Sequence, residues 1–394
     1  MSIDLLQVKG VKCSSIASGI KKNNILDLSL ISLSKGSSTA AVFTRNIFCA
    51  APVIVSKNHV NSNIEALLIN SGNANAGTGE RGLEDCYNTC VYLAEELEIK
   101  PEQVLPFSTG VIGEFLPLEA FKSNVNILVS SLSKNGMSKV ANGILTTDLV
   151  EKSYSTSINI GGKTVTLSGV AKGSGMIRPD MATMLSFIVS DISASKEELQ
   201  DCLTHAVNQS FNRITVDGDT STNDACSLSA TNQSGVQLSQ CKGEFQKALN
   251  LVSKELAQMI VKDGEGATKF VEIKIEGLES SEDCLEVAYT IAHSPLVKTA
   301  LFASDANWGR ILAAVGRTKV NGVSIENIDI YINDLQIIVS GEKSSTYTEE
   351  LGSAEMQKSE IIIRVNLGTT SLSESVWTTD LSYDYVKINA EYRS

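Results

Sequence analysis

Hydrophobic and polar residues alternate along much of the first hundred positions, which is the pattern of β-strands with one buried face. Residues 23–57 contain three such runs, NILDLSLISL, STAAVFTRN and APVIVS, separated by turn-forming Ser, Gly and Asn. The segments ALLIN at 66–70 and VLPFSTGVIG at 104–113 predict two more strands. The chain is therefore expected to begin with a β-sheet.

Helical periodicity enters between these strands. A loop rich in Gly and Asn, SGNANAGTGERG at 71–82, leads into residues 83–99, where hydrophobic residues recur every three or four positions. Residues 117–144 are also expected to be helical. Strands that alternate with helices predict a mixed α/β class for this half of the chain.

The middle of the chain predicts a hairpin, a buried strand and two helices. STSINIGGKTVTLSGVAKG is expected to turn at Gly161–Gly162, and TMLSFIVSD at 183–191 to form a strand. Ser195 with Glu198 predicts a capping box for a helix that ends near Phe211. A second amphipathic helix is predicted over 243–262.

Beyond residue 262 the two patterns continue without an internal repeat or an obvious linker. Strands are predicted at 270–276, 284–292, 326–340, 359–366 and 383–389, and short helices at 295–302 and 307–316. A chain of 394 residues exceeds the size of one small core, so two or three domains are expected. The predicted class is α/β, mixed α+β, with smaller α+β domains in the C-terminal half.

Composition narrows the range of partners. Formal net charge is -12 and the isoelectric point is near 4.9, which argues against nucleic acid and anionic membranes, because binding phosphates needs clustered Lys and Arg. The N-terminal segment lacks the features of a signal peptide, and no stretch of 18 hydrophobic residues occurs. Eight scattered cysteines fit reduced thiols. A cytoplasmic protein is expected.

Histidine is too scarce for the commonest catalytic and metal sites. The three histidines, His59, His205 and His293, lie far apart in the sequence without carboxylates at ligand spacing. A Ser-His-Asp triad or a His-based metal site is therefore not expected. NSGNANAGTG lacks the spacing of nucleotide-binding loops, and DGDTSTND lacks the final Glu of a calcium loop. No metal and no cofactor is predicted.

One segment suggests chemistry that needs no histidine. In GVAKGSGMIRPDMATMLSFIVSD, at 169–191, a glycine-rich turn leads through Ala182 into Thr183 and then directly into a strand. Taken alone, this is also the sequence of an ordinary hairpin with a surface lysine. A Thr released at a chain N-terminus, however, carries a hydroxyl nucleophile and its own base, the α-amino group.

The segment KGSGMIRPDMATML, at 172–185, resembles the self-cleavage motif KGSGMIxPxMATML of the bifunctional ornithine acetyltransferase family, the glutamate N-acetyltransferases of arginine biosynthesis. Further blocks resemble the same family in the same order, and together they span nearly the whole chain. They are NSGNANAGTG, STGVIG, TVDGDTSTND, DGEGATK, SPLVKTALFASDANWGRI and DLSYDYVKINAEYRS. The sequence departs from the motif's usual small or neutral residues at Arg178 and Asp180, whose effect on the cleavage rate is open.

The resemblance implies an enzyme that cuts itself between Ala182 and Thr183. Two chains would result, 1–182 with the α/β domain and 183–394, whose subdomains are expected at about 183–280 and 281–394. Thr183 would then take the acetyl group from N2-acetyl-L-ornithine and pass it to L-glutamate. The family further implies a heterotetramer of two α and two β chains, and acetyl-CoA stays open as a second acetyl donor.

The family's site residues carry over to eight positions besides the cleavage residue Ala182. Thr109 and Gly110 in STGVIG resemble its oxyanion hole, which stabilises the charge of the reacting acetyl oxygen. Thr183 is the nucleophile. The substrate contacts that the resemblance implies are Thr146, Lys172, Thr183, Glu265, Asn389 and Ser394. Thr146 is chosen over its neighbour Thr147, and each of these positions taken alone would suit a turn, a surface charge or a solvated loop.

Two other functions remain compatible with the residues. A self-processing aminopeptidase or amidase of related architecture would use the same nucleophile but pass the acyl group to water. A noncatalytic small-molecule-binding member would keep the scaffold and fail to cut itself. The polar residues Lys172, Glu265, Asn389 and Ser394 suit a small zwitterion and favour the transferase.

Overall fold

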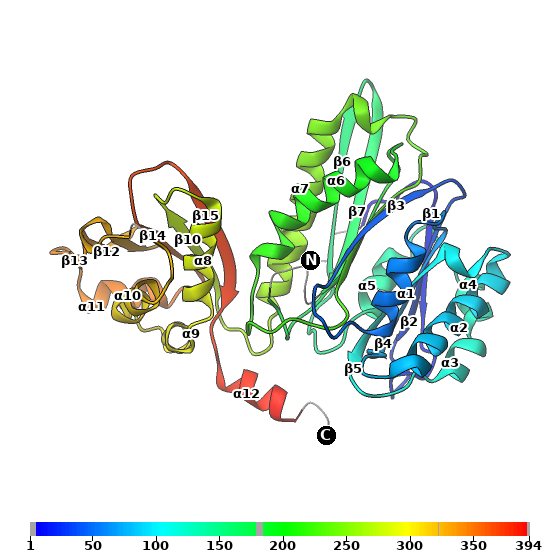
Figure 1. The fold of residues 1–394 in the computed structure, drawn as a ribbon, viewed down its shortest axis with the longest axis horizontal. Helices are drawn as coiled ribbons and strands as arrows, with labels where there is room; N and C mark the ends of the chain where they lie inside the picture. Colours follow the sequence, from blue (N-terminus) through cyan, green and yellow to red (C-terminus); the bar gives the residue numbers. More distant parts are fainter. Residues whose placement is uncertain (1–4, 179–183, 322, 392–394) are drawn as a thin grey trace. The chain divides into compact units, whose positions relative to one another are not determined.

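The computed structural model describes residues 5–178, 184–321 and 323–391. They form two compact units (Figure 1). Unit 1 consists of Met1–Asn212 with Asp219–Ile260, and unit 2 of Arg213–Gly218 with Val261–Ser394. The cut predicted after residue 182 lies within unit 1, and the predicted division into two chains stays a prediction.

Two sheets form the centre of unit 1. The first sheet has the order β1-β2-β4-β5, in which β4 and β5 run parallel. The second has the order β3-β9-β8-β7-β6, in which β8 and β9 run parallel. The strands are β1 Val11–Ile16, β2 Leu28–Leu33, β3 Ser38–Phe43, β4 Ala66–Asn73, β5 Val104–Val111, β6 Lys152–Ile160, β7 Lys163–Lys172, β8 Leu185–Ser190 and β9 Ala225–Ala230.

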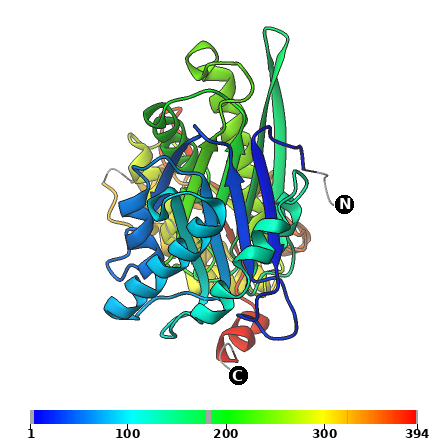
Figure 2. The same ribbon diagram turned by 90° about the vertical axis from the view of Figure 1, so that its right-hand side faces the viewer.

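Helices cover the outer faces of both sheets (Figures 1 and 2). Helices α1 to α4 pack on the first sheet, and α6 and α7 on the second. The helices are α1 Ala51–His59, α2 Gly79–Leu97, α3 Leu118–Lys122, α4 Val125–Ser130, α5 Met137–Gly143, α6 Lys196–Asn208 and α7 Lys242–Lys262, with 3-10 turns at Pro101–Gln103, Phe211–Arg213 and Leu238–Gln240. Unit 1 is therefore a four-layer sandwich of helices, two sheets and helices.

The two sheets share one hydrophobic core. Phe107 of β5 and Phe187 of β8 meet edge to face with their ring centroids 4.9 Å apart. Both side chains are buried, and aliphatic residues from both sheets and from α5 surround them. This packing brings the end of β5, in one sheet, close to the ends of β7 and β8 in the other.

Unit 2 is built on a six-stranded mixed sheet with the order β13-β12-β11-β14-β10-β15. Strand β10 runs parallel to β14 and antiparallel to β15. The strands are β10 Phe270–Glu276, β11 Asp329–Ile332, β12 Leu335–Val339, β13 Glu342–Lys343, β14 Glu360–Asn366 and β15 Ser373–Thr379; the helices are α8 Ser281–Ala292, α9 Pro295–Phe302, α10 Trp308–Gly316, α11 Glu349–Met356 and α12 Tyr383–Ala390, with a 3-10 turn at Ile325–Asn327. Helices α8 to α10 share a hydrophobic core with the sheet.

The predicted mixed α/β class is confirmed, and so are several local elements. The hairpin β6–β7 turns at Gly161–Gly162, as its two glycines predicted. The Ser195 hydroxyl accepts the Glu198 backbone N–H while the Glu198 side chain accepts the Ser195 N–H, which confirms the capping box of α6. Helix α7, Lys242–Lys262, matches the predicted helix over 243–262.

Three predicted strands are wrong, because each segment is a helix. The run APVIVS lies in α1, whose first turn contains Pro52, a residue that suits a helix start. The predicted strand 284–292 belongs to α8, in which buried Cys284, Val287, Ala288 and Ile291 recur at helical spacing. The predicted strand 383–389 is α12, which is capped by the Ser382 hydroxyl.

Two further differences concern segments that sequence patterns described too coarsely. The predicted helical region 117–144 is divided into the three short helices α3, α4 and α5. Strand β15, SESVWTT, was not predicted because its polar first half hides the alternation. It pairs with β10 along seven residues of each strand, from Phe270↔Thr379 to Glu276↔Ser373.

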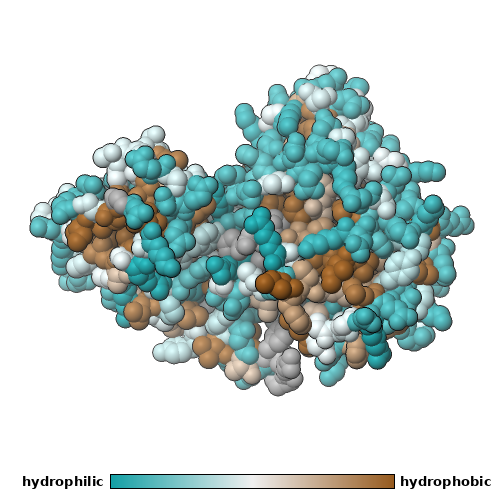
Figure 3. Space-filling model, viewed as in Figure 1, coloured by the Kyte–Doolittle hydropathy of each residue, from teal (hydrophilic) through white to brown (hydrophobic). Residues whose placement is uncertain are grey.

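Surface character agrees with this layered packing. Hydrophilic side chains cover most of the face shown in Figure 3, and hydrophobic ones gather there in a few patches. The large hydrophobic residues with high exposure include Ile47 and Phe48, in the loop between β3 and α1. Within the described ranges, no helix has the length and hydrophobicity needed to cross a membrane.

Replacing Phe187 with Ala is expected to lower the free energy of unfolding by about 3–5 kcal/mol, because the ring leaves a cavity between the two sheets. Urea-induced unfolding measures the loss. The matched control is Ile127→Ala, which truncates a side chain that is 48% exposed and should change stability by no more than about 0.5 kcal/mol. Equal losses in the two variants would contradict the shared core.

Candidate active site

The predicted oxyanion pair lies at the end of β5. Gly110 is opposite Gly72 of β4 and has a φ of 135°, a conformation that other residues adopt rarely. A Cβ atom at Gly110 would lie 2.3 Å from the Gly72 carbonyl carbon and 2.5 Å from the Asn73 backbone nitrogen. Only glycine fits where β5 approaches β4 this closely. The backbone next to Thr109 is therefore held in place by its contact with β4.

Lys172 ends β7 and reaches across to Thr109. Its ammonium group donates a hydrogen bond to the Thr109 hydroxyl oxygen over 3.2 Å. The lysine side chain is 12% exposed, and Thr109 is buried. The structure thus brings together two predicted site residues that are 63 positions apart in the sequence.

A buried carboxylate, Asp148, lies behind Lys172. Its Oδ1 accepts a hydrogen bond from the Lys152 ammonium at 2.7 Å and another from the Gly173 backbone N–H at 2.7 Å. Its Oδ2 accepts the Thr146 N–H at 3.0 Å and lies 4.0 Å from the Lys172 ammonium. Burial by itself would raise the pKa of Asp148, but the two lysines and these hydrogen bonds hold it well below its usual range.

A third lysine, Lys21, adds positive charge nearby. Its ammonium donates to the carbonyl oxygens of Leu26 at 3.2 Å and Leu145 at 2.7 Å. The pKa of Lys21 is lowered to about 8, mainly by burial and also by the positive charge of Lys172, whereas Asp27 and Asp148 act in the opposite direction. The positive charge of this region therefore decreases above neutral pH.

A second buried carboxyl group, Asp224, directly precedes β9. The N–H of the following Ala225 donates to the carbonyl of Met184, the residue after the predicted nucleophile. Asp224 is 4% exposed, and its Oδ2 has no hydrogen-bond partner among the described residues. Burial raises the pKa of Asp224 well above its usual range, although the Ser221 hydroxyl and Lys172 oppose this shift. A buried carboxyl group with a raised pKa therefore lies beside the start of β8.

The segment before β9 also ties the two sheets together. The Asn223 amide donates to the Ser108 carbonyl at 2.9 Å and to the Ala74 carbonyl at 2.6 Å. Its Oδ1 accepts the Thr222 hydroxyl at 2.6 Å. Asn223 lies in the segment that leads into β9 of the second sheet. Ser108 lies in β5 of the first sheet, and Ala74 directly follows β4 of that sheet. The strand ends that carry Thr109 are thereby fixed to the segment that carries Asp224.

Glu265 and Asn389 meet within unit 2. The Asn389 amide donates to Glu265 Oε2 at 2.8 Å and to the Tyr385 carbonyl at 3.0 Å. Glu265 follows α7 and is 8% exposed, so the interpretation as a solvated acidic loop is wrong. A Cβ at Gly266 would lie 2.4 Å from the Tyr385 nitrogen, so glycine is needed where α12 approaches this turn.

Thr146 and Thr147 differ in their contacts. The N–H of Thr146 is bound to Asp148, and its hydroxyl lies 3.5 Å from the same carboxylate oxygen. The Thr147 hydroxyl instead shares a hydrogen bond of 2.7 Å with Ser174. The choice of Thr146 as a substrate contact stays a prediction. Ala182, Thr183 and Ser394 lie outside the described residues.

Sequence reasoning missed Asp148 and Asp224. Asp148 and Lys152 are four positions apart, a spacing that normally indicates an exposed ion pair on a helix, yet here both side chains are fully buried outside a helix. Asp224 lies in TVDGDTSTND, one of the family-like blocks, but nothing in its spacing indicates burial. All eight cysteines lie in the described part of the chain and are free.

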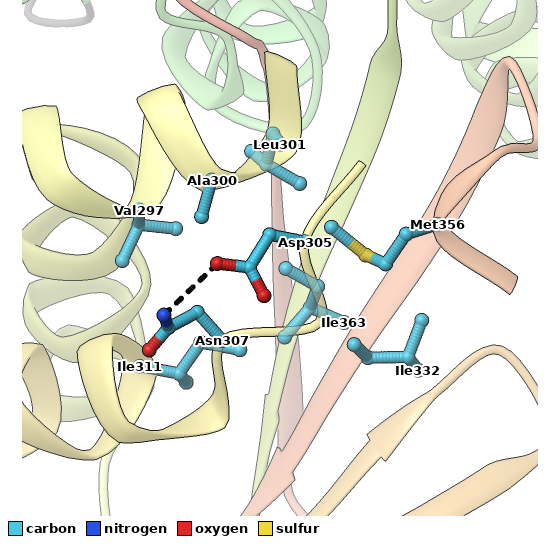
Figure 4. A pocket seen from close by; sticks show the side chains of 9 residues that line it. All are labelled: Val297, Ala300, Leu301, Asp305, Asn307, Ile311, Ile332, Met356 and Ile363. Atoms are coloured by element: carbon cyan, nitrogen blue, oxygen red, sulfur yellow. Dashed lines mark hydrogen bonds between the residues drawn. The ribbon is translucent and has the colours of Figure 1, made fainter. Parts of the chain in front are cut away.

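A small pocket in unit 2 contains none of the predicted site residues (Figure 4). Its lining is mostly hydrophobic, and within it the Asn307 amide donates to Asp305 at 3.0 Å. The lining residues are Val297, Ala300, Leu301, Asp305, Asn307, Ile311, Ile332, Met356 and Ile363. Among the described residues, no three His, Cys, Asp or Glu side chains converge as metal ligands would; the prediction of no metal stays a prediction.

The strand ends carry a hydroxyl, an ammonium group and two buried carboxyl groups whose pKa values are shifted in opposite directions. Such a set is typical of an enzyme site for a small polar molecule. Comparison with known proteins agrees with this class. A family model described as the ArgJ family matches residues 12–394. The arginine biosynthesis bifunctional protein ArgJ of Pseudomonas fluorescens (strain Pf0-1) is 48% identical over 392 residues, which cover 98% of this chain and 97% of that protein.

A further relative and two solved structures match as well. The protein of the same name from Methylococcus capsulatus (strain Bath) is 48% identical over 396 residues, covering 100% of this chain and 97% of its own. A crystal structure of ArgJ from Bacillus halodurans is 40% identical with a TM-score of 0.42, covering 44% of this chain and 91% of that chain. Ornithine acetyltransferase from Mycobacterium tuberculosis, solved with ornithine, is 30% identical with a TM-score of 0.39, covering 45% and 97%.

The chain belongs to the ArgJ family. It is therefore an enzyme of arginine biosynthesis, of the acyltransferase class that its motifs predicted.

Replacing Gly110 with Ala is expected to force β4 and β5 apart, because the new Cβ would overlap the backbone of Gly72. Gly113→Ala is the matched control, since Gly113 also has a positive φ but has no atom near its Cβ position. The control should lower stability by about 1–2 kcal/mol and Gly110→Ala by clearly more, as measured by thermal unfolding. Equal losses would refute the close crossing.

Asp224→Asn is expected to make stability less dependent on pH. Because the folded-state pKa of Asp224 is raised, the folded state keeps a proton that the unfolded state loses above its ordinary pKa near about 4. The contribution of Asp224 to the free energy of unfolding is therefore greatest at low pH. It falls by up to about 1.4 kcal/mol per pH unit as pH rises toward the folded-state pKa. Urea unfolding between pH 5 and pH 8 measures the slope, with exposed Asp201→Asn as control; an unchanged slope in Asp224→Asn would contradict a neutral Asp224.

Proposed function

We propose that this enzyme transfers the acetyl group of N2-acetyl-L-ornithine to L-glutamate through an acetyl-Thr183 intermediate. Before turnover, the chain cuts its own Ala182–Thr183 bond, which frees the α-amino group of Thr183. The single observation that carries the proposal is the motif KGSGMIRPDMATML, at 172–185, in a chain that belongs to the ArgJ family over nearly its full length. The hydrogen bond between Lys172 and Thr109 supports it.

The reaction divides into two acyl transfers. The α-amino group of Thr183 accepts the hydroxyl proton as the oxygen attacks the acetyl carbon of N-acetylornithine. The tetrahedral intermediate then expels ornithine, whose nitrogen takes up the proton, and leaves an acetyl ester on Thr183. The amine of glutamate attacks this ester in the second half-reaction, which restores the free hydroxyl. A shared acyl-enzyme predicts ping-pong kinetics.

Negative charge develops on the acetyl oxygen in both half-reactions and needs preorganised donors. The proposed donors are the Thr109 hydroxyl and the Gly110 backbone N–H. Because the Lys172 ammonium already donates to the Thr109 oxygen, the Thr109 hydroxyl proton is free to donate to another acceptor. This arrangement supports the assignment of Thr109 to the oxyanion hole.

Substrate recognition is assigned to the polar residues that match the family's substrate contacts. Lys172, and the hydroxyls of Thr146 and Ser394, would contact the substrate's carboxylate and amide groups. Glu265, held by Asn389 at 2.8 Å, would pair with a charged amine of ornithine. A carboxylate that is nearly buried attracts an ammonium group more strongly than an exposed one, because water screens it less.

The cellular setting follows from the same proposal. We infer a cytoplasmic enzyme that acts without a metal or cofactor on small molecules, without nucleic acid or membrane partners. Acetyl-CoA is a second acetyl donor in a bifunctional form of the reaction. The two chains, 1–182 and 183–394, would assemble as a heterotetramer of two α and two β chains.

The proposal predicts two fragments after purification, the second of which begins at Thr183. Intact mass spectrometry with N-terminal sequencing measures the cut, and Thr183→Ala should remain one chain because it lacks the attacking hydroxyl. Thr183→Ser keeps a hydroxyl and is the matched control, so it should still be cut. An uncut wild-type chain would overturn the proposed nucleophile.

Initial rates measured with labelled N-acetylornithine and glutamate test the transfer itself. Label that appears on glutamate, with parallel double-reciprocal plots, supports the acetyltransferase. Label that appears as free acetate whether or not glutamate is present would indicate the self-processing amidase instead. No release of label would indicate a noncatalytic binding protein.

A further inference from the structure

Asp148 links two residues to which the proposed function assigns substrate contacts. It lies in the connection between α5 and β6, and its side chain is fully buried. One carboxylate oxygen accepts the N–H of Gly173, the residue next to Lys172, at 2.7 Å. The other accepts the N–H of Thr146 at 3.0 Å and faces the Lys172 ammonium at 4.0 Å.

We propose that Asp148 is the positioning residue that holds Thr146 and Lys172 in place for the substrate and keeps the Lys172 ammonium charged. This inference rests on the proposed function for the identity of the substrate. Asp148 does not touch the reacting atoms itself; it acts through the two residues that it fixes.

The geometry argues against Asp148 being only the counter-ion of Lys152. That role needs one carboxylate oxygen, and the Lys152 ammonium is bound to Oδ1 at 2.7 Å. The second oxygen is directed at Thr146 and Lys172 instead. A buried carboxylate that binds backbone N–H groups on two separate segments fixes their spacing, since moving either segment would leave a buried charge with a lost hydrogen bond.

Other charges around Lys172 must be separated from the effect of Asp148. Lys21, from the segment before β2, repels the Lys172 ammonium and loses its own proton at a pKa of about 8. Asp224, before β9, attracts it only when ionised, and burial raises the pKa of Asp224 well above its usual range. Lys152, on β6, is bound to the same carboxylate. A test must therefore report on Lys172 alone.

The experiment measures how fast each lysine of the full chain is methylated by formaldehyde and a mild reductant between pH 6 and pH 11. Only the neutral amine reacts, and mass spectrometry of peptides reports Lys172 separately from Lys21. Asp148→Asn leaves Lys152 buried without its counter-charge, so the double variant Asp148→Asn with Lys152→Met removes both charges together. Lys152→Met alone keeps Asp148 and is the matched control.

A second control separates this effect from any loss of a buried carboxyl group. Asp191 follows β8 at the end opposite Leu185, and its carboxylate accepts the Thr166 N–H at 2.8 Å. Asp191→Asn removes a buried, hydrogen-bonded carboxyl group of the same unit without touching Lys172, and it should leave the labelling midpoint of Lys172 unchanged.

The proposal predicts that the labelling midpoint of Lys172 falls by about one pH unit or more in the double variant, because an opposite charge at this distance favours the ammonium form. Lys152→Met should keep the midpoint or raise it. For acetyl transfer, KM for N-acetylornithine should rise about tenfold in the double variant at pH 8, because Thr146 and Lys172 lose the charged hydrogen-bond acceptor that positions them, while kcat changes less.

A Lys172 midpoint that is the same in the wild type and the double variant would overturn the proposal. An equal fall in Lys152→Met and in the double variant would also overturn it, because the effect would then come from breaking the ion pair. If the wild type transfers no acetyl group, the proposed function fails, but the labelling still decides whether Asp148 controls Lys172.

Discussion

Hydrophobic contact between the two sheets of unit 1 is the constraint on which the candidate site depends. Thr109 lies near the end of a strand of the first sheet, and Lys172 ends a strand of the second. Their hydrogen bond exists because Phe107 and Phe187 hold the sheets face to face. At the strand ends, Asn223 adds polar contacts to the Ser108 and Ala74 carbonyls, where hydrophobic side chains no longer determine the spacing.

The two buried carboxyl groups near this point illustrate how surroundings decide charge. Asp148 has two lysine ammonium groups and backbone N–H donors around it, which lower its pKa despite burial. Within the part of the chain that the structure describes, one oxygen of Asp224 has no hydrogen-bond partner, and burial raises the pKa of Asp224. A single region thus contains one carboxyl group with a lowered pKa, which binds cations, and one with a raised pKa beside the start of β8. Such divergence of pKa values is common at functional sites.

Local patterns in the sequence predicted those elements whose cause is local. The hairpin at Gly161–Gly162 and the capping box of Ser195 with Glu198 depend on residues a few positions apart. The segments that became α1, α8 and α12 were mistaken for strands, because short runs fit both the strand period and the helix period. Ser280 and Ser382 cap α8 and α12, and Pro52 lies in the first turn of α1.

The candidate site shows the same limit. The family-like motifs indicated Thr109, Lys172, Glu265 and Asn389, and the structure adds that they form two bonded pairs. Asp148 was not predicted as a site residue, because its spacing to Lys152 is typical of a surface ion pair. Its burial depends on contacts between segments that are distant in the sequence. No sequence spacing could reveal that one carboxylate joins residues 146 and 173.

The central claim is that Thr183 carries the acetyl group between donor and acceptor. Its most direct test is to mix the purified enzyme with N-acetylornithine in the absence of glutamate, quench with acid and determine the mass of the fragment that begins at residue 183. The account predicts a gain of one acetyl group, located on the Thr183 hydroxyl by fragmentation and lost when glutamate is added. A cut enzyme that transfers acetyl groups but never shows this adduct, or shows it on another residue, would contradict the account.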